Sequence, residues 1–594
     1  MARCLVVVVL AAWVGWPAGA AAAGRWSQPL AVAHPARPAE VVDAVLCGGE
    51  AVVAWEDFDI VGTGRNTTTE RFALWIASAA IGQPFGASQL LERTDVGPGA
   101  AVAASPAGGC AVTWQSGRAI RIALRPPGGT FGAPVTVTRA LLAAPVRVGI
   151  DDGGSATVLW SEFGTVPSLT GPVRTATVSP AGAVAIHDVG GEVLPGSRLA
   201  LAVGAAGQAV AAWSGFPGPP GQGRSDARVA LRPAGGQFGA ATTFADPAAN
   251  LYMAGASIDG AGRATVAVQR ARHGPCTPVA GDPGGVEILQ GSADGGWGTP
   301  QGLDAGVQAT NVRLVSNPRG DRAATWDVQP LNPREVGASR VAPAPGGQPF
   351  GPLLLTAMPV TADAIPDTSA GDVQTGAAVD GAGETLVLRD GPSRGMQIHP
   401  VSPTAKAGPA ESVLANACAG GSGHLAVDPF STVAAVAYHG RPDGLWIVYR
   451  DTGAPAPEAA PRICELRWSP ALPGAHRAPA GPIRLFARLS KPTAHLVVTV
   501  RDRHRRVVSS RRLGPRPVGY ASLTLRGRHG APTLPAGRYR VTATATDLAG
   551  RQSLATAIDL RVVRRHPRAQ RKPVASGRGA SGLAGRPSGG SSSL

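Results

Sequence analysis

The residues of this sequence best suited to chemistry are arginines, which are concentrated near the C-terminal end. Residues 461–594 contain 26 lysines and arginines against four acidic residues, whereas residues 1–460 contain 29 against 35. Guanidinium groups pair with anionic groups such as carboxylates and phosphates through charge-assisted hydrogen bonds. The charge asymmetry indicates two modules with different surroundings, and the second favours anionic polymers. The alternative is that the arginines provide only solubility.

Alternation along the expected strands decides which arginines face solvent. In residues 483–489 and 538–545, every second position is an apolar or small residue. The positions between them are mostly arginines or threonines, and these are expected to face solvent. Further arginines crowd an expected hairpin tip at 501–506. The candidate residues for binding an anionic polymer are Arg484, Arg488, Arg501, Arg503, Arg505, Arg506, Arg538 and Arg540.

The sequence lacks the motifs that are typical of catalysis, cofactors or metals. Its eleven histidines are scattered, and it has no zinc-protease, nucleophile-elbow or phosphate-loop motif. We therefore predict no cofactor and no catalytic or metal-binding residue, and favour a protein that is not an enzyme. Four aspartates that precede a recurring strand are interpreted as turn residues rather than calcium ligands or catalysts: Asp151, Asp259, Asp380 and Asp428.

Five cysteines follow the N-terminal segment, and their odd number leaves at least one without an intramolecular partner. Cys47 and Cys110 both lie just before the recurring strand of consecutive units, so neighbouring units could bring them together. A bond between Cys418 and Cys464 would join the two modules. Cys276 would remain free.

Residues 1–23 have the pattern of a secretory signal peptide. A basic residue, Arg3, precedes an apolar run at 5–16 and small residues at 21–23. No later stretch reaches the roughly 18 to 20 apolar residues of a membrane-spanning helix. Arginine also predominates over lysine, which we interpret as the codon bias of a GC-rich bacterium. We therefore expect a secreted protein without a membrane span.

A strand that commonly ends in tryptophan recurs along residues 24–452. Its copies end at positions 55, 114, 160, 213, 268, 326, 389 and 437, which gives a period of about 55 residues. A period of this size fits the four-stranded blade of a β-propeller. The tryptophans occupy one structural position, so we interpret them as packing residues rather than ligand-stacking residues: Trp55, Trp114, Trp160, Trp213 and Trp326.

A Gly-Gly-aromatic signature follows most copies and marks the fourth strand of each unit: Gly-Gly is interpreted as the turn, the aromatic residue as an apolar anchor, and the residues after them as an edge strand. The last unit lacks this signature, while residues 25–32 resemble an orphan fourth strand placed before the first unit. The N-terminal strand could therefore pair with the last unit as its missing fourth strand, which would leave no strand edge exposed. We predict an all-β fold with an eight-bladed propeller, or seven blades if the unit around 384–389 is incomplete.

Residues 291–300, GSADGGWGTP, resemble the Asp-box turn of sialidase-type propellers. They are one residue short of the Ser-x-Asp-x-Gly-x-Thr-Trp spacing and lack its threonine. The likeness covers one turn, and the arginines and tyrosine nucleophile of that family have no counterpart that can be matched here. It therefore implies a distantly related repeat and no sialidase activity.

A Pro/Ala linker at 453–461 separates the propeller from about seven expected strands in residues 462–563. Within them, residues 534–553 resemble the last hairpin of bacterial Ig-like domains, with Tyr539 in the tyrosine-corner position and Asp547 and Gly550 in the exit turn. The resemblance implies a basic Ig-like β-sandwich. The polar tail at 564–594 is rich in Gly, Ser and Arg and is expected to be disordered.

Two functions are compatible with this organisation. The first is a secreted, non-catalytic binding or scaffold protein, in which the propeller recognises a ligand and the Ig-like domain associates with an anionic envelope polymer or polysaccharide. The second is a carbohydrate-active enzyme, a glycoside hydrolase or lyase, with carboxylates at the mouth of the propeller channel. No motif favours specific nucleic-acid recognition, and the sequence does not indicate an oligomeric state.

Overall fold

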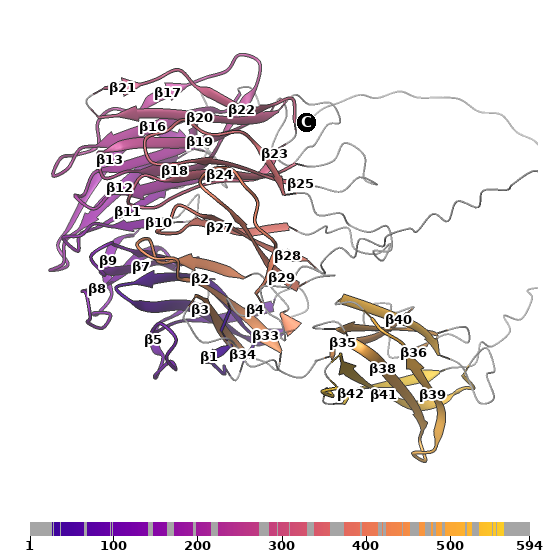
Figure 1. The fold of residues 1–594 in the computed structure, drawn as a ribbon. Helices are drawn as coiled ribbons and strands as arrows, with labels where there is room; N and C mark the ends of the chain where they lie inside the picture. The colour runs from indigo at the N-terminus through magenta and orange to yellow at the C-terminus, as the bar shows by residue number, and fades with distance from the viewer. Residues whose placement is uncertain are drawn as a thin grey trace, which may run out of the picture.

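The computed structural model describes residues 26–562 apart from short internal gaps, of which the longer ones are 140–145, 163–170, 216–223, 272–283, 329–337, 357–372, 452–462, 470–476 and 526–533. The predicted signal peptide, linker and tail lie outside the described residues. Within these residues the protein is all-β, and its strands are joined without a helix (Figure 1). Among them there is accordingly no helix that could serve as a membrane span.

The strands from β2 to β34 form antiparallel sheets that follow one another along the chain. The first four sheets are β2 (Ala39–Cys47), β3 (Glu50–Thr63), β4 (Thr68–Ala80) and β5 (Gln89–Thr94); β6 (Ala101–Ala104), β7 (Cys110–Ser116), β8 (Ala119–Arg125) and β9 (Val135–Arg139); β10 (Arg147–Ile150), β11 (Ala156–Ser161), β12 (Gly171–Val178) and β13 (Val184–Val193); and β14 (Leu199–Val203), β15 (Ala209–Gly215), β16 (Asp226–Arg232) and β17 (Thr242–Phe244).

Four further sheets complete this region in the described residues. They are β18 (Asn250–Ile258), β19 (Arg263–Ala271), β20 (Gly285–Ser292), β21 (Gly296–Trp297) and β22 (Gln301–Ala305); β23 (Ala309–Ser316), β24 (Arg322–Val328), β25 (Ala338–Ala344) and β26 (Leu354–Thr356); β27 (Val373–Val379), β28 (Thr385–Gly391), β29 (Gly395–Val401) and β30 (Glu411–Ser412); and β31 (Cys418–Ala419), β32 (His424–Val427), β33 (Ala434–Arg441) and β34 (Gly444–Arg450) with β1 (Leu30–Ala33). Every copy of the recurring strand lies in the second strand of its own sheet.

The turn after the first strand has the same hydrogen bonds in six of these sheets. The first turn residue donates its backbone N–H to the carbonyl four residues later, and a glycine three residues later donates back to the first residue. That glycine has a positive φ, which residues with a Cβ adopt only with strain. The aspartate carboxylates accept a further backbone hydrogen bond, as from Ser155 to Asp151 at 2.8 Å. These contacts confirm the turn interpretation. The first turn residues are Ser105, Asp151, Gly204, Asp259, Asn317 and Asp380.

The Gly-Gly-aromatic signature forms a turn before the fourth strand, as predicted. Gly129 donates to the carbonyl of Pro126 at 3.0 Å, and Gly132 donates to the carbonyl of Leu124 at 2.9 Å. Phe131, which lies between these two glycines, is buried and anchors the turn. The fourth strand, β9, then begins at Val135.

Apolar side chains between successive sheets form the core of this region. The recurring tryptophans are at most 2% exposed and lie in separate clusters, each built from two neighbouring sheets. Trp160, for example, packs with Ile120 and Ile122 of the preceding sheet. Trp55 of the first sheet packs in one cluster with Leu445 and other residues of the last. This burial supports the packing role predicted for the tryptophans.

The N-terminal segment pairs with the last of these sheets. Strand β1 is antiparallel to β34, with Leu30 opposite Ile447. Trp26 forms a bridge to Arg450, and Ser27 donates its N–H to the carbonyl of Tyr449 at 2.7 Å. The segment thus occupies the place of the strand that the last unit lacks in its own sequence.

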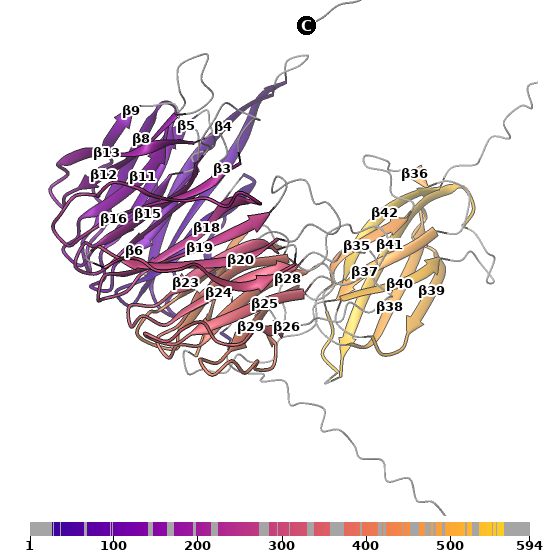
Figure 2. The ribbon, with the colours of Figure 1, turned by 90° about the horizontal axis from the view of Figure 1, so that it is seen from above.

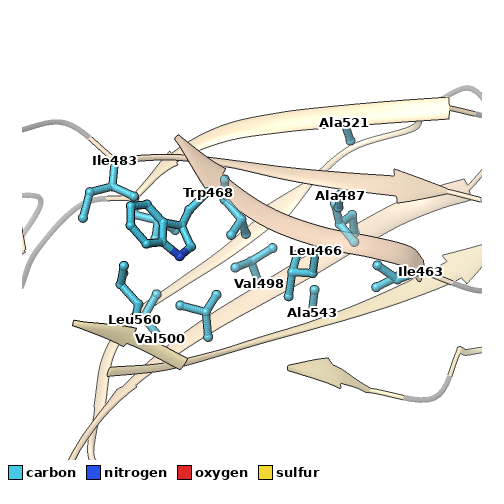
Figure 3. Packing of buried hydrophobic residues seen from close by; sticks show 14 of the residues in the cluster. Ile463, Leu466, Trp468, Ile483, Ala487, Val498, Val500, Ala521, Ala543 and Leu560 are labelled. Atoms are coloured by element: carbon cyan, nitrogen blue, oxygen red, sulfur yellow. The ribbon is translucent and has the colours of Figure 1, made fainter. Parts of the chain in front are cut away.

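Two packed sheets form the C-terminal region (Figure 2). One contains β35 (Ile463–Ser469), β37 (Ile483–Leu489) and β40 (Gly519–Leu525). The other has the order β36 (Arg477–Ala478), β42 (Thr556–Val562), β41 (Gly537–Asp547), β38 (Thr493–Asp502) and β39 (Val507–Leu513). Figure 3 shows their shared core, in which Trp468 lies over apolar side chains from both sheets.

The inward and outward residues of this region follow the predicted alternation. Ile483 and Leu485 are at most 1% exposed, whereas Arg484 between them is exposed. Tyr539 is buried, and its hydroxyl donates a hydrogen bond to the carbonyl of Pro535 at 2.8 Å. A buried tyrosine that bonds to the backbone a few residues upstream is the geometry expected of a tyrosine corner.

Candidate functional site

The predicted arginines of the C-terminal region divide between the outer surfaces of its two sheets. Arg484 is exposed on β37, and Arg488 lies on the same strand with its side chain outside the described part. The others gather on the second sheet and at the tip of the β38–β39 hairpin. This second group consists of Arg501, Arg503, Arg505, Arg506, Arg538 and Arg540.

Strand pairing places the second group in rows across the sheet. Arg501 of β38 lies directly opposite Arg540 of β41, which in turn lies opposite Asp559 of β42. In the next row, Arg538 lies opposite Arg561. Residues opposite each other on neighbouring strands have their Cβ atoms about 5 Å apart. We call the surface formed by Arg501, Arg503, Arg505, Arg538, Arg540 and Arg561 the arginine face.

A hollow of about 820 Å³ lies in the arginine face and is lined by all six of its arginines. Its two acidic lining residues are Asp502 and Asp559. Asp502 accepts backbone hydrogen bonds from His504 and Arg506, which help to lower the pKa of its carboxyl despite the opposing effect of desolvation. Asp559 is 3.9 Å from Arg540 in an exposed ion pair, which contributes little to stability. Most of the positive charge therefore stays available to a ligand.

Arg561 was missed by the sequence analysis, although it belongs to the arginine face. It lies on the outward side of β42, between the buried residues Leu560 and Val562. The alternation of this strand could have identified it. Its position opposite Arg538 depends on the sheet order and could not be read from one strand alone.

The inner strands of the first region surround a channel, and the repeated turns lie at one end of it. A cavity of about 550 Å³ is lined there mainly by small and aliphatic residues, together with the turn residues Asp259 and Asp428. Asp259 and Asp428 accept hydrogen bonds from their own turns. No group of three or more His, Cys, Asp or Glu that could hold a metal occurs among the described residues.

Acidic residues and a histidine lie toward the opposite end of the channel. Asp43 on β2 accepts hydrogen bonds from the backbone of Ala44 and Val102, both at 2.9 Å, and its carboxylate is 4.0 Å from Nδ1 of His424. Burial raises the pKa of Asp43 and lowers the pKa of His424, so both shifts favour the neutral forms.

Two glutamates are directly opposite each other at the same end of the first sheet. Glu40 of β2 pairs with Glu56 of β3. Burial raises the pKa of Glu56, and the like charge of Glu40 raises it further. Two carboxyl groups in different environments can divide the roles of general acid and general base between them.

The disulfide between Cys47 and Cys110 is present, as predicted. It joins the end of β2 to the start of β7 in the next sheet, and both cysteines are buried. Cys418 and Cys464 lie on described strands, β31 and β35, but their side chains are outside the described part, as is the whole of Cys276.

The Asp-box-like segment lies at the β20–β21 hairpin. Gly291 pairs with Trp297, and Ser292 Oγ accepts a hydrogen bond from the N–H of Gly295 at 2.9 Å. Gly291 has a cramped position, since an added Cβ would meet Trp297 at 2.7 Å. The segment is thus a tight, self-contained turn.

Comparison with known proteins gives likenesses only among solved structures. No family model matches the sequence, and no curated protein is significantly similar to it. The β-propeller domain of a trilobed protease from Pyrococcus furiosus is 10% identical, with a TM-score of 0.36, over 63% of this chain and 95% of that one. An ulvan lyase is 12% identical, with a TM-score of 0.36, over 57% and 89%. An α-L-arabinanase from Penicillium chrysogenum is 11% identical, with a TM-score of 0.30, over 52% and 92%.

The order of the sheets themselves defines the class of this region. Successive antiparallel sheets of about four strands pack face to face in chain order, with the first strand of each next to the first strand of the following sheet. This arrangement is a β-propeller.

Proposed function

We propose that this protein is a secreted bacterial binding protein whose arginine face associates with an anionic polymer, such as an acidic polysaccharide of the cell envelope. The observation that carries this proposal is the convergence of six arginines around one hollow with only two acidic residues. Guanidinium groups in such an arrangement attract polyanions and pair with their acidic groups.

The proposed architecture is an eight-bladed propeller followed by an Ig-like β-sandwich. Packing of the first sheet against the last and the pairing of β1 with β34 support closure of the ring by the N-terminal segment. The hydrogen bond between Tyr539 and Pro535 supports the Ig-like assignment. In this arrangement the propeller presents its channel while the sandwich holds the protein near the polymer.

The test is retention of the full-length mature chain on immobilised dextran sulfate as the salt concentration is raised. We expect a triple variant, Arg501→Gln with Arg538→Gln and Arg540→Gln, to elute at markedly lower salt than the wild type. The matched control is a second triple variant, Arg118→Gln with Arg139→Gln and Arg484→Gln, because it removes three exposed arginines that lie outside the arginine face. Equal loss in both variants would show that net charge alone governs retention and would contradict the proposal.

A carbohydrate-active enzyme is the second candidate, favoured by the pairing of Glu40 with Glu56. The raised pKa of Glu56 suits a general acid. Release of new reducing ends from acidic polysaccharides by the full-length chain, and its loss in Glu56→Gln, would support this function. Absence of product with the wild type across such substrates would leave the binding function alone.

A further inference from the structure

At one position of the inner strands, some sheets carry a large basic side chain where other sheets carry a small residue. This position lies four residues before the first turn residue, and its occupants are Ala101, Arg147, Ala200, Gly255, Arg313, Gly376 and His424. Alanine or glycine fills four of these seven places, as packing around a narrow axis requires. The two arginines and the histidine are therefore not explained by the repeat, which would accept a small residue in their place.

Arg147 and Arg313 line the same cavity, together with Arg198, which directly precedes β14. The cavity has a volume of about 400 Å³ and lies at the end of the channel opposite the repeated turns. The side chain of Arg147 is fixed by two backbone carbonyls, those of Val146 and Leu199, each at 3.2 Å. We call Arg147, Arg198 and Arg313 the channel arginines.

The other two channel arginines have no such partners. Within the described part of the chain, the guanidinium groups of Arg198 and Arg313 make no hydrogen bond or ion pair, and both residues are exposed to the channel solvent. Desolvation by the surrounding channel wall lowers the pKa of Arg147 and of Arg313, and repulsion by Arg198 lowers both further. Guanidinium groups with lowered pKa values around one cavity are a pattern that marks candidate binding sites for anions.

Nearby acidic groups balance only part of this charge. Asp43 attracts Arg147, and burial raises the pKa of its carboxyl. Asp327 attracts Arg313 and is held by hydrogen bonds from the side chains of Asn311 and Ser339. Three guanidinium groups against these two carboxyl groups leave a positive net charge around the cavity.

A bulge in the backbone sets the direction of the Arg313 side chain. The pairing of β23 with β24 shifts between Thr310 and Arg313, and Asn311 inside this bulge has a φ of 51°. A non-glycine residue in this conformation is uncommon and is stabilised here by its hydrogen bond to Asp327 at 3.0 Å. Bulges re-aim side chains and are frequent next to functional sites. The bulge thus presents Arg313 to the cavity.

We propose that the channel arginines form a binding site for a small ligand that bears an oxyanion, the carboxylate of a sugar acid or a sulfate group. Planar guanidinium groups bind such anions through paired hydrogen bonds, and the cavity is within the size range of small-molecule sites. This site lies on the propeller and is independent of the arginine face, so either can fail without the other.

The test is isothermal titration of the full-length mature chain with glucuronate, inorganic sulfate and glucose. Glucuronate is expected to bind and glucose not, and sulfate binding would show that the anion alone suffices. Arg313→Gln and Arg198→Gln should each weaken glucuronate binding by about tenfold, since each removes a charge-assisted hydrogen bond. Arg118→Gln, at the exposed β7–β8 turn, is the matched control and should leave binding unchanged.

Both test residues are exposed, so their variants are expected to keep the melting temperature of the wild type. Arg313→Lys gives a second readout, because it keeps the charge but loses the planar fork and should bind with intermediate affinity. The triple variant of the arginine face should retain glucuronate binding. Equal affinity in Arg313→Gln, Arg198→Gln and the wild type, or equal binding of glucose and glucuronate, would overturn the proposal.

Discussion

The indole Nε1 of Trp26 donates a hydrogen bond to Oε2 of Glu411 at 3.0 Å, although the two residues are 385 positions apart in the sequence. The same carboxylate accepts two hydrogen bonds from Arg450, at 3.0 and 2.8 Å. Arg450 is fully buried and also binds Glu384 at 2.8 Å. Trp26 therefore ties the N-terminal segment to a buried ion network between the last two sheets of the propeller.

This network predicts that Glu411→Gln destabilises the propeller more than Trp26→Phe. Replacing Glu411 leaves Glu384 as the remaining anionic partner of the buried Arg450, so the cost is about 3 kcal/mol, at the low end of the range for breaking a buried ion pair. Replacing Trp26 removes one hydrogen bond and costs about 1–2 kcal/mol. Urea unfolding of the full-length chain measures both. Trp297→Phe is the control, since its indole makes no hydrogen bond within the described residues; a loss in Trp26→Phe no larger than in this control would contradict the role of the bond.

Removal of the disulfide between the first two sheets is expected to lower the free energy of unfolding. Cys47 and Cys110 close a loop across 63 positions of sequence, so the bond is expected to contribute about 2–5 kcal/mol by restricting the unfolded chain. The double variant Cys47→Ala with Cys110→Ala should unfold at lower urea concentration than the wild type. Cys276→Ala should match the wild type, and equal midpoints for all three proteins would show that the bond is dispensable.

Local pattern was sufficient to predict much of the fold from sequence. The position of the tryptophans, the period and the aspartate turns are each set by contacts that recur in most units, and the structure places them accordingly. The turn before the fourth strand was predicted for the same reason, because its glycines are visible in the sequence and form the hydrogen bonds seen at Gly129 and Gly132.

The candidate sites were predicted less completely, for two physical reasons. Arg561 reaches the arginine face only because β42 pairs with β41, and that order is a property of the whole sheet. Arg147 and Arg313 belong to inner strands of two sheets that have two other sheets between them in the sequence, and a bulge sets the direction of Arg313. Neither long-range pairing nor a bulge leaves a signal in the alternation of a single strand.

The contact between strands β31 and β35 makes a second disulfide testable. These strands contain Cys418 and Cys464, and they lie against each other. We expect a bond between the two cysteines, joining the propeller to the C-terminal region. Mass mapping of peptides from a non-reduced digest should detect this cross-link, with Cys276 recovered as a free thiol. A bond from Cys276 to either of them would refute this pairing.

The environment of His424 predicts a specific loss of stability in mild acid. Burial lowers the pKa of this imidazole from its ordinary value of 6.5, and repulsion by Arg313 acts in the same direction, while Asp43 and Glu40 oppose it. A histidine whose pKa is lower in the folded state binds its proton more tightly when unfolded, so its protonation favours unfolding as the pH falls below about 6.5. The raised pKa of Asp43 acts with the opposite sign, because the folded protein holds that proton more tightly.

Asp43 is present in both proteins, so the difference between the wild type and His424→Gln reports the histidine. Between pH 7 and 5.5, His424→Gln should lose less in melting temperature than the wild type. His504→Gln, which changes an exposed histidine on the β38–β39 hairpin, should follow the wild type. Parallel melting curves for wild type and His424→Gln across this range would contradict the assignment of a buried, neutral imidazole at this end of the channel.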